Sequence, residues 1–157
     1  MDNKLKGIEE LKEIVKTLKN NGEKIVFTNG CFDLIHRGHI FYLQEAKKYG
    51  DRLIVAINSD KSINRIKGDK RPITPEKERA LTVASLQAVD YVTIFDKTDP
   101  LEIITELEPD ILIKGGDWKI EEVIGREIIE KRGGKVFTIP PIKGVSTTEI
   151  IKRIIEK

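Results

Sequence analysis

The sequence has very little cysteine and almost no excess of charge of either sign. Cys31 is the only cysteine among 157 residues, which excludes an internal disulfide, a CxxC redox pair and a zinc site built from several thiolates. We therefore expect a protein of a reducing, cytoplasmic environment. Lys and Arg number 28 and Asp and Glu 26, a formal net charge of +2. So small a surplus does not predict a nucleic-acid-binding surface.

Long hydrophobic runs are also missing. No apolar stretch approaches the ~18 residues that a membrane-spanning helix needs, and the first residues, MDNKLKGIEELKE, contain no hydrophobic region typical of a signal peptide. We expect neither membrane association nor export. Hydrophobic residues still make up 39% of the chain, enough for a buried core, and the length suits one domain over residues 1–157.

Apolar residues at helical spacing open the chain and then alternate with short apolar runs. The first pattern, from Leu5 to Leu18, predicts an amphipathic helix within residues 1–22 that packs on the domain. At Thr74-Pro75 and Asp99-Pro100 we expect a capping residue followed by Pro at the first helical position. Strands are predicted at residues 24–29, 52–58, 91–95, 111–114 and 136–139, and further helices around 40–46, over 125–132 and from Ser146.

Continuously apolar strands that alternate with helices predict a parallel sheet buried on both faces. We therefore expect a single doubly wound, Rossmann-like α/β domain. Ligands of such sheets bind outside the carboxyl ends of the strands, so the candidate binding residues are those that follow each strand. The segment between residues 60 and 72 is the one stretch that we expect to form a mobile loop.

Both histidines of the chain lie at the start of a predicted helix, after the first strand. His36-Arg37-Gly38-His39 places them three residues apart, on one helix face. The unpaired N–H groups of a helix N-terminus attract phosphate, imidazoles can donate to its oxygens, and Gly38 lets phosphate approach the backbone. The alternatives are incidental capping histidines or a zinc site, which two histidines support poorly. Neither GxxxxGK[ST] nor GxGxxG occurs, which disfavours P-loop NTPases and dinucleotide dehydrogenases.

Basic residues cluster after the second predicted strand. They form either a phosphate-binding loop or merely a solvated, charged one. In the helix that follows, Arg79 most simply forms a surface salt bridge. The cluster contains Lys61, Arg65, Lys67, Lys70 and Arg71.

Glycines and hydroxyls follow the fourth and fifth predicted strands. In KGGDW, residues 114–118, paired glycines allow a flat ligand near the backbone and Asp117 suits ribose or base edges, although a plain turn competes. Trp118 either stacks on a ligand or covers apolar surface. In the segment STTE, residues 146–149, the first and last residues match a capping box. The two threonine hydroxyls between them suit a phosphate at a helix N-terminus.

Taken together, TNGCFDLIHRGH and GVSTT resemble the HxGH cytidylyltransferase-like nucleotidyltransferases. NSDKS, KGDKRP, VDYVTIF and PDILIKGGDW extend the resemblance from Lys24 to the C-terminus, and within that family they are most similar to the adenylyltransferases that make ADP-heptose. The resemblance implies transfer of AMP from ATP to D-glycero-β-D-manno-heptose 1-phosphate, with release of pyrophosphate, for lipopolysaccharide core synthesis. Related glycerol-phosphate cytidylyltransferases carry an Arg-Thr pair before STT. This chain has Pro141-Ile142-Lys143-Gly144 there, which argues against that relative.

The resemblance also implies roles for individual residues. His36 and His39 are implied to contact the triphosphate, and Lys67 and Arg71 the sugar phosphate or pyrophosphate; these four are the implied catalytic residues. No protein residue is implied as a metal ligand, because Mg²⁺ would be bound mainly through the triphosphate. Nucleotide binding is implied for Thr28, Asn29, Gly30, Cys31, Phe32, Gly38, Arg79, Lys114, Gly115, Asp117, Ser146, Thr147 and Thr148.

Such chemistry needs no paired nucleophile and base. The second pKa of a phosphate monoester is near ~6, so the attacking oxygen is ionised at neutral pH, and the rate depends on alignment and on neutralising charge. The rivals are a sibling enzyme that uses CTP or another acceptor, such as glycerol phosphate or a flavin precursor, and a nucleotide-binding regulator without turnover. From the resemblance we expect a homodimer. We also expect a separate sugar kinase to supply the acceptor, since 157 residues leave no room for the kinase fused to the matching domain in many bacteria.

Overall fold

Five parallel strands form one central sheet in the computed structural model, which describes residues 2–116 and 118–157. The strands lie in the order β3-β2-β1-β4-β5, and each neighbouring pair is parallel. The predicted doubly wound α/β fold is therefore confirmed. The chain moves outward from β1 in one direction and then returns to pair β4 on the other side of β1, which creates a crevice at the carboxyl ends of these two strands. The strands are β1 (Ile25–Gly30), β2 (Arg52–Asn58), β3 (Tyr91–Phe95), β4 (Ile111–Gly115) and β5 (Lys135–Ile139).

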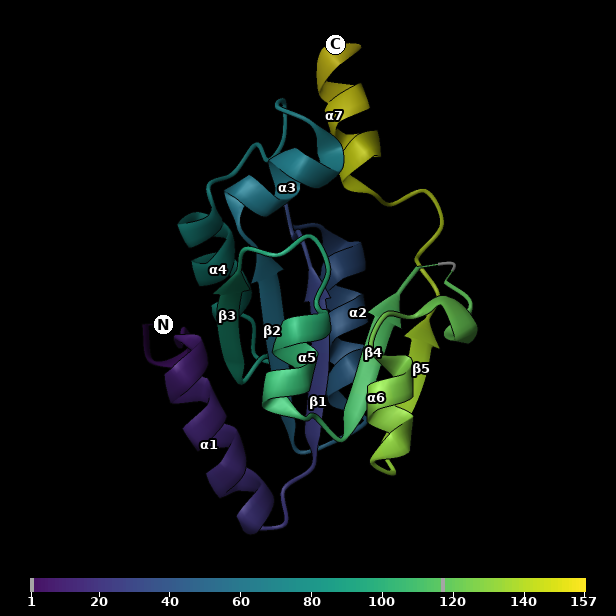
Figure 1. The fold of residues 1–157 in the computed structure, drawn as a ribbon. Coiled ribbons are helices and arrows are strands. Elements are labelled where there is room, and N and C mark those ends of the chain that lie inside the picture. The colour runs from purple at the N-terminus through teal and green to yellow at the C-terminus, as the bar shows by residue number, and fades with distance from the viewer. Residues whose placement is uncertain (1, 117) are drawn as a thin grey trace.

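Helices cover both faces of the sheet (Figure 1). α1, α5 and α6 pack on one face, and α2 and α4 pack on the other. Figure 1 shows α3 and α7 beyond the carboxyl ends of the strands, at the end of the molecule opposite the C-terminal end of α1. The helices are α1 (Ile8–Asn20), α2 (Arg37–Lys47), α3 (Asp60–Lys67), α4 (Glu76–Ala84), α5 (Leu101–Leu107), α6 (Arg126–Lys131) and α7 (Thr147–Ile155), with short 3-10 helices at Asp2–Lys4 and Ile120–Glu122.

The core consists of two apolar clusters separated by the sheet. Within β1, Phe27 contributes to the cluster under α1 and α5, whereas its neighbour Val26 contributes to the cluster under α2 and α4. Successive side chains of a strand point to opposite faces, so strands covered on both sides must be apolar throughout. This is the physical origin of the continuously apolar strands in the sequence.

The N-terminal helix begins three residues later than the apolar pattern predicts. Leu5 forms a parallel bridge with Val92, and the backbone N–H of Lys6 donates to the Val92 carbonyl at 2.9 Å. These residues extend the sheet edge at β3 and are thereby prevented from joining the helix. α1 packs on the sheet through Leu11 and Val15, both buried.

The segment predicted as a loop between residues 60 and 72 is instead helical over its first part, as α3. The Ser59 side chain caps this helix by accepting from the backbone N–H of Ser62 at 3.1 Å, and Ile63 is fully buried beneath it. The prediction was wrong because eight residues contain too few apolar positions to show a helical period, and the basic residues dominate the composition. Only the stretch after Lys67 connects to α4 without regular structure.

The two predicted Pro-initiated helices also begin one residue later than expected. Pro75 and Pro100 occupy the N-cap positions of α4 and α5, so neither proline is the first helical residue. At α5 the carboxylate of Asp99 accepts from the backbone N–H of Leu101 at 2.9 Å, an Asx turn that fixes the helix start. No helix within the described residues is both long enough and apolar enough to cross a membrane.

Candidate functional site

A cleft of about 790 Å³ lies at the carboxyl ends of the strands and contains residues from the segments that follow all five strands. It brings together most of the residues that the sequence predicted for the site, including both histidines, Lys67, Arg71 and residues 146–148. The position agrees with the crevice between β1 and β4, where the strand order reverses. Three predicted residues are exceptions: Thr28 and Arg79 lie beneath the cleft, and Asp117 lies outside the described residues.

The two histidines lie side by side at the N-terminus of α2. Nδ1 of His36 accepts from the backbone N–H of Gly38 at 3.1 Å, and Nδ1 of His39 accepts from the backbone N–H of His36 at 3.4 Å. The rings are stacked, with centroids 3.9 Å apart. The histidines therefore do cap the helix, as the simpler interpretation predicted. Capping uses only Nδ1, so each neutral imidazole carries its proton on Nε2 and can donate it to a ligand.

Both imidazoles are poor bases in this position. Burial, together with repulsion from the protonated form of His36 and from Lys67, lowers the pKa of His39 to about 4. Burial likewise lowers the pKa of His36. At neutral pH both side chains are therefore uncharged hydrogen-bond donors, which suits binding to phosphate oxygens better than proton abstraction.

Gly38 lies between the histidines and the C-terminal segment. A Cβ atom at this position would lie 3.0 Å from the His36 ring and 3.3 Å from Cγ1 of Val145. The glycine therefore allows the N-terminus of α2 to pack closely against the residues that precede α7. Ser146 caps α7 by accepting from the backbone N–H of Glu149 at 3.1 Å, which is one of the two hydrogen bonds of the predicted capping box. The next residue, Thr147, donates its hydroxyl to the Asp33 carbonyl at 2.8 Å.

Three cationic side chains line the cleft. Lys67 ends α3, and Arg71 follows in the connection to α4, where its Nε donates to the Asp33 carboxylate at 2.8 Å. Lys114, on β4, places its Nζ 5.6 Å from the ring centroid of Trp118, a cation–π contact. Burial lowers the pKa of Lys114. Positive charge thus surrounds the histidines on the β2 side and the β4 side of the crevice.

Arg79 is buried below the cleft, with only 1% of its surface exposed. The expected surface position is therefore wrong. Arg79 does pair with a carboxylate, that of the partly exposed Asp60, but the guanidinium itself is buried and also donates to three backbone carbonyls. Its partners are the carbonyls of Cys31, Asn58 and Thr74, at 2.5, 2.9 and 2.8 Å, and the Asp60 carboxylate at 2.8 Å. Arg79 therefore joins the segments after β1 and β2 from beneath.

Thr28 is also fully buried, and its hydroxyl lies 2.6 Å from the hydroxyl of Tyr42. Tyr42, which sequence reasoning missed, lines the cleft and donates to the Ile113 carbonyl at 3.1 Å. Its hydroxyl thereby connects β1 to β4 at the crevice. The signal was present in the sequence, since Tyr42 follows His39 by three residues and so shares its helix face.

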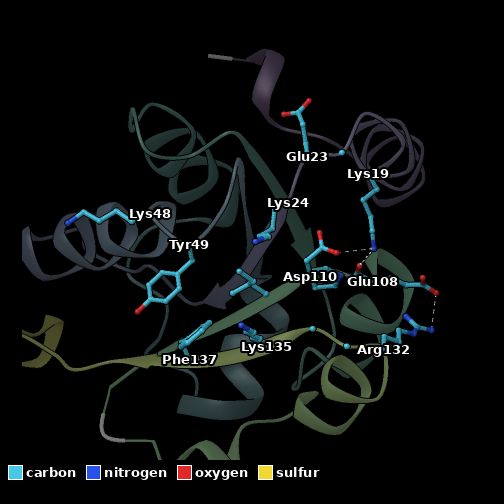
Figure 2. Close-up of a pocket in the computed structure, with 15 residues that line it drawn as sticks. Lys19, Glu23, Lys24, Lys48, Tyr49, Glu108, Asp110, Arg132, Lys135 and Phe137 are labelled. Atoms are coloured by element: carbon cyan, nitrogen blue, oxygen red, sulfur yellow. Dashed lines mark hydrogen bonds and ion pairs between the residues drawn. The ribbon is translucent and has the colours of Figure 1, made fainter.

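A second hollow of about 660 Å³ lies at the opposite end of the sheet (Figure 2). Lys19 donates to the Glu108 carbonyl at 2.7 Å and lies 3.6 Å from Asp110, and Arg132 pairs with the Glu108 carboxylate at 2.9 Å. Figure 2 draws these interactions as dashed lines. Lys19 and Arg132 also lie at the C-terminal ends of α1 and α6, where cations offset the helix dipole. These charges therefore have structural roles, and the cleft is the stronger candidate site.

The chain is similar to proteins of a known family. A family model described as cytidylyltransferase-like matches residues 27–153. The chain is 49% identical over 156 residues to the "Bifunctional protein HldE" of Trichlorobacter lovleyi and 51% identical over 150 residues to that of a Nitratiruptor species. These matches cover 99% and 96% of the chain, but the chain spans only 32% of the length of either relative.

The fold also resembles solved structures, among them the following two. A lipopolysaccharide core biosynthesis protein from Thermoplasma volcanium is 35% identical, with a TM-score of 0.67, over 78% of this chain and 100% of that one. A pantoate-beta-alanine ligase from Francisella tularensis is 18% identical, with a TM-score of 0.63, over 98% of this chain and 78% of that one. At such low identity the second likeness concerns the fold alone.

Proposed function

This chain belongs to the cytidylyltransferase-like family, and on that premise we propose that it transfers AMP from ATP to D-glycero-β-D-manno-heptose 1-phosphate, forming ADP-heptose and pyrophosphate. The observation that carries the proposal is the pair of neutral histidines at the N-terminus of α2, whose Nε2 donors are left available in the same cleft as Lys67 and Arg71. Identity of about half to the HldE relatives, over nearly the whole chain, supports the choice of acceptor.

The proposed reaction needs only groups that bind and orient phosphates. The ionised phosphate oxygen of the acceptor attacks the α-phosphorus of ATP, a new P–O bond forms, and the bond to the β-phosphate oxygen breaks as pyrophosphate leaves with the electron pair. The acceptor is already ionised at neutral pH, so no residue has to remove a proton. His36 and His39 donate from Nε2 to the phosphates, and Lys67 and Arg71 neutralise charge that moves to the leaving group.

The two ends of the cleft suit the two ends of a nucleotide. One end of the cleft, near the histidines, is polar. The other end is apolar and is formed by residues that come after β4 and β5 in the chain: Trp118, Ile124, Pro140 and Pro141. The Trp118 side chain is 47% exposed, and an exposed indole offers a flat face for a base. We assign the base to this end, with Lys114 and Gly115 beside it, and the triphosphate to the N-terminus of α2 and residues 146–148.

A divalent metal, Mg²⁺ in our proposal, fits this site as a companion of the triphosphate. Among residues 2–116 and 118–157, no group of three or more His, Cys, Asp or Glu side chains gathers to hold a metal ion. The donor set therefore fits a metal carried by the phosphates, which keeps most of its ligands outside the protein. When bound, the metal would neutralise part of the phosphate charge.

Four further features belong to the proposal. The need for ATP favours a cytoplasmic site of action. The acceptor carries its phosphate on the anomeric oxygen, so a sugar kinase must supply it. The protein acts on small molecules, as the cleft implies, and we propose that it does so as a homodimer.

The test is a matrix of ATP, CTP, GTP and UTP against heptose 1-phosphate, glycerol 3-phosphate and a flavin precursor, with pyrophosphate release as the measurement. ATP with heptose 1-phosphate is expected to react fastest. Product from CTP and another acceptor would refute the specific assignment and keep the reaction class. No pyrophosphate from any pair would refute nucleotidyl transfer and favour a nucleotide-binding regulator. His39→Ala, prepared in parallel, shows whether any turnover comes from this cleft.

A further inference from the structure

We infer that Asp33 is a positioning residue of the cleft. Its carboxylate binds Arg71 and the connection between α3 and α4, and thereby holds the Arg71 side chain toward the phosphates of a bound ligand. The inference rests on the proposed function and assigns a residue for which the sequence alone indicated no role. Asp33 follows β1 by three residues and is only 2% exposed. A carboxylate this deeply buried needs compensating partners.

The Asp33 carboxylate has three partners, all in the connection that leads from α3 to α4. Oδ2 accepts from Nε of Arg71 at 2.8 Å and from the backbone N–H of Ile73 at 3.0 Å, and Oδ1 accepts from the backbone N–H of Thr74 at 3.0 Å. Burial alone would raise the pKa of Asp33, but these hydrogen bonds and the charge of Arg71 lower it below its usual value. The carboxylate therefore stays ionised and holds this connection to the segment after β1.

The backbone around Asp33 joins a third segment. Its carbonyl accepts the hydroxyl of Thr147 at 2.8 Å, so the residue connects the start of α7 to the same point. The flanking residues Phe32 and Leu34 have φ angles of 49° and 48°, in the left-handed region that non-glycine residues rarely adopt. Such strain persists only where surrounding bonds over-determine the conformation. The bonds of Asp33 supply that constraint, and they hold the phosphate-facing segments after β1, β2 and β5 together.

Asp33 acts on a ligand through Arg71. Both of its carboxylate oxygens are engaged by protein donors, and it does not line the cleft, whereas Arg71 does. Because Asp33 binds Nε, the two Nη groups of Arg71 are left to form a planar fork. Such a fork matches two oxygens of a phosphate. Without the carboxylate, the long arginine side chain would have to lose its rotational freedom when the ligand binds.

The test is a double-mutant cycle of Asp33→Asn and Arg71→Ala, with inorganic pyrophosphate as the probe and calorimetric Kd as the measurement. Each single variant is expected to weaken pyrophosphate binding by about 10-fold or more, the loss typical of a charged hydrogen bond. The double variant is expected to bind no more than about 2-fold more weakly than Arg71→Ala, since Asp33 acts through Arg71. Losses that multiply in the double variant overturn the inference.

Asp110→Asn is the matched control. Like Asp33, Asp110 accepts a backbone N–H from a distant segment. Its donor is Ile25 of β1, at 2.8 Å, and the bond lies at the opposite end of the sheet. Asp110→Asn should lower the thermal midpoint and leave the Kd for pyrophosphate unchanged. If Asp33→Asn behaves in the same way, Asp33 is merely structural and the inference fails.

One further measurement keeps the test decisive. If Asp33→Asn does not fold, the Nε–H resonance of Arg71 in the unmodified protein, identified by its loss in Arg71→Ala, should exchange slowly with water; rapid exchange refutes the bond to Asp33. The pyrophosphate cycle requires no turnover. A protein inactive on every substrate pair, yet with coupled Asp33 and Arg71, would refute the proposed reaction and retain this inference.

Discussion

Replacement of His39 by alanine should separate catalysis from folding. The substitution removes the Nε2 donor, which the protein leaves available, and the Nδ1 acceptor of the His36 N–H. It also removes the stack on His36 at 3.9 Å and the tilted contact with Phe32 at 5.3 Å. The first loss affects the reaction, and the others affect the N-terminus of α2.

The loss of the Nε2 donor and the loss of the structural contacts differ in magnitude. A donor to a developing negative charge is typically worth ~10²–10³ in kcat, or about 2.7–4 kcal/mol. The structural terms are smaller: about 1 kcal/mol for a hydrogen bond, here a long one of 3.4 Å, and about 0.5–1.5 kcal/mol for an aromatic pair. A domain stable by about 5–15 kcal/mol stays folded after such a change. His39→Ala should therefore be a folded protein with little turnover.

The assay is steady-state pyrophosphate release beside urea unfolding of the same preparation. Gln44→Ala is the control, since Gln44 is an exposed residue of the same helix and should retain the kcat of the unmodified protein. A His39→Ala variant whose kcat stays within about 3-fold of the control, against the ~10² expected, refutes the role of His39. So does a loss of kcat that merely follows a smaller folded fraction.

Three other predictions concern pH, the buried arginine and a crowded glycine. NMR of the imidazoles should give His39 a pKa of about 4. Because the pKa in the unfolded chain is higher, near ~6.5, the unfolded chain binds more protons between these two pH values. The free energy of unfolding should therefore fall as the pH drops through this window, and it should fall less steeply in His39→Ala. Arg79→Lys should cost about 1–3 kcal/mol in urea unfolding, because a lysine has too few donors for the four acceptors and a buried carbonyl left without a donor is costly. A loss well below about 1 kcal/mol would contradict the network. Gly115→Ala should cost about 1–3 kcal/mol by overpacking, since its Cβ would lie 2.9 Å from the Tyr42 ring. Gly7→Ala, with no atom within 4 Å, should cost less, about 0.5–1 kcal/mol, because Gly7 is the N-cap of α1 and alanine is a poorer N-cap than glycine.

The fold and the location of the site follow from local patterns. Apolar strands alternating with helices allow few solutions other than a parallel sheet covered on both faces. The spacing of His36 and His39 places them on one face of a helix start wherever that helix lies. Ser146 likewise caps α7 as its motif predicts. Such features depend on residues a few positions apart, so the sequence displays them directly.

The errors occurred where distant segments decide a residue's surroundings. α3 looked like a charged loop, since its helical state depends on burying Ile63 against the sheet. Arg79 looked like a surface residue, since its acceptors at Cys31 and Asn58 are 48 and 21 residues away. The pattern also placed Leu5 in a helix, although its bridge to Val92 holds it at the sheet edge.

By itself, then, the sequence determined the alternation of strands with most of the helices and the edge of the sheet at which the candidate cleft lies, because strands that run parallel bring their carboxyl ends to one side. Tertiary structure alone decided which polar residues face the cleft and which hold it together. Asp33 illustrates the difference, with partners 38 residues away at Arg71 and 114 residues away at Thr147. Whether such a carboxylate is exposed or buried depends on contacts that exist only once the chain has folded.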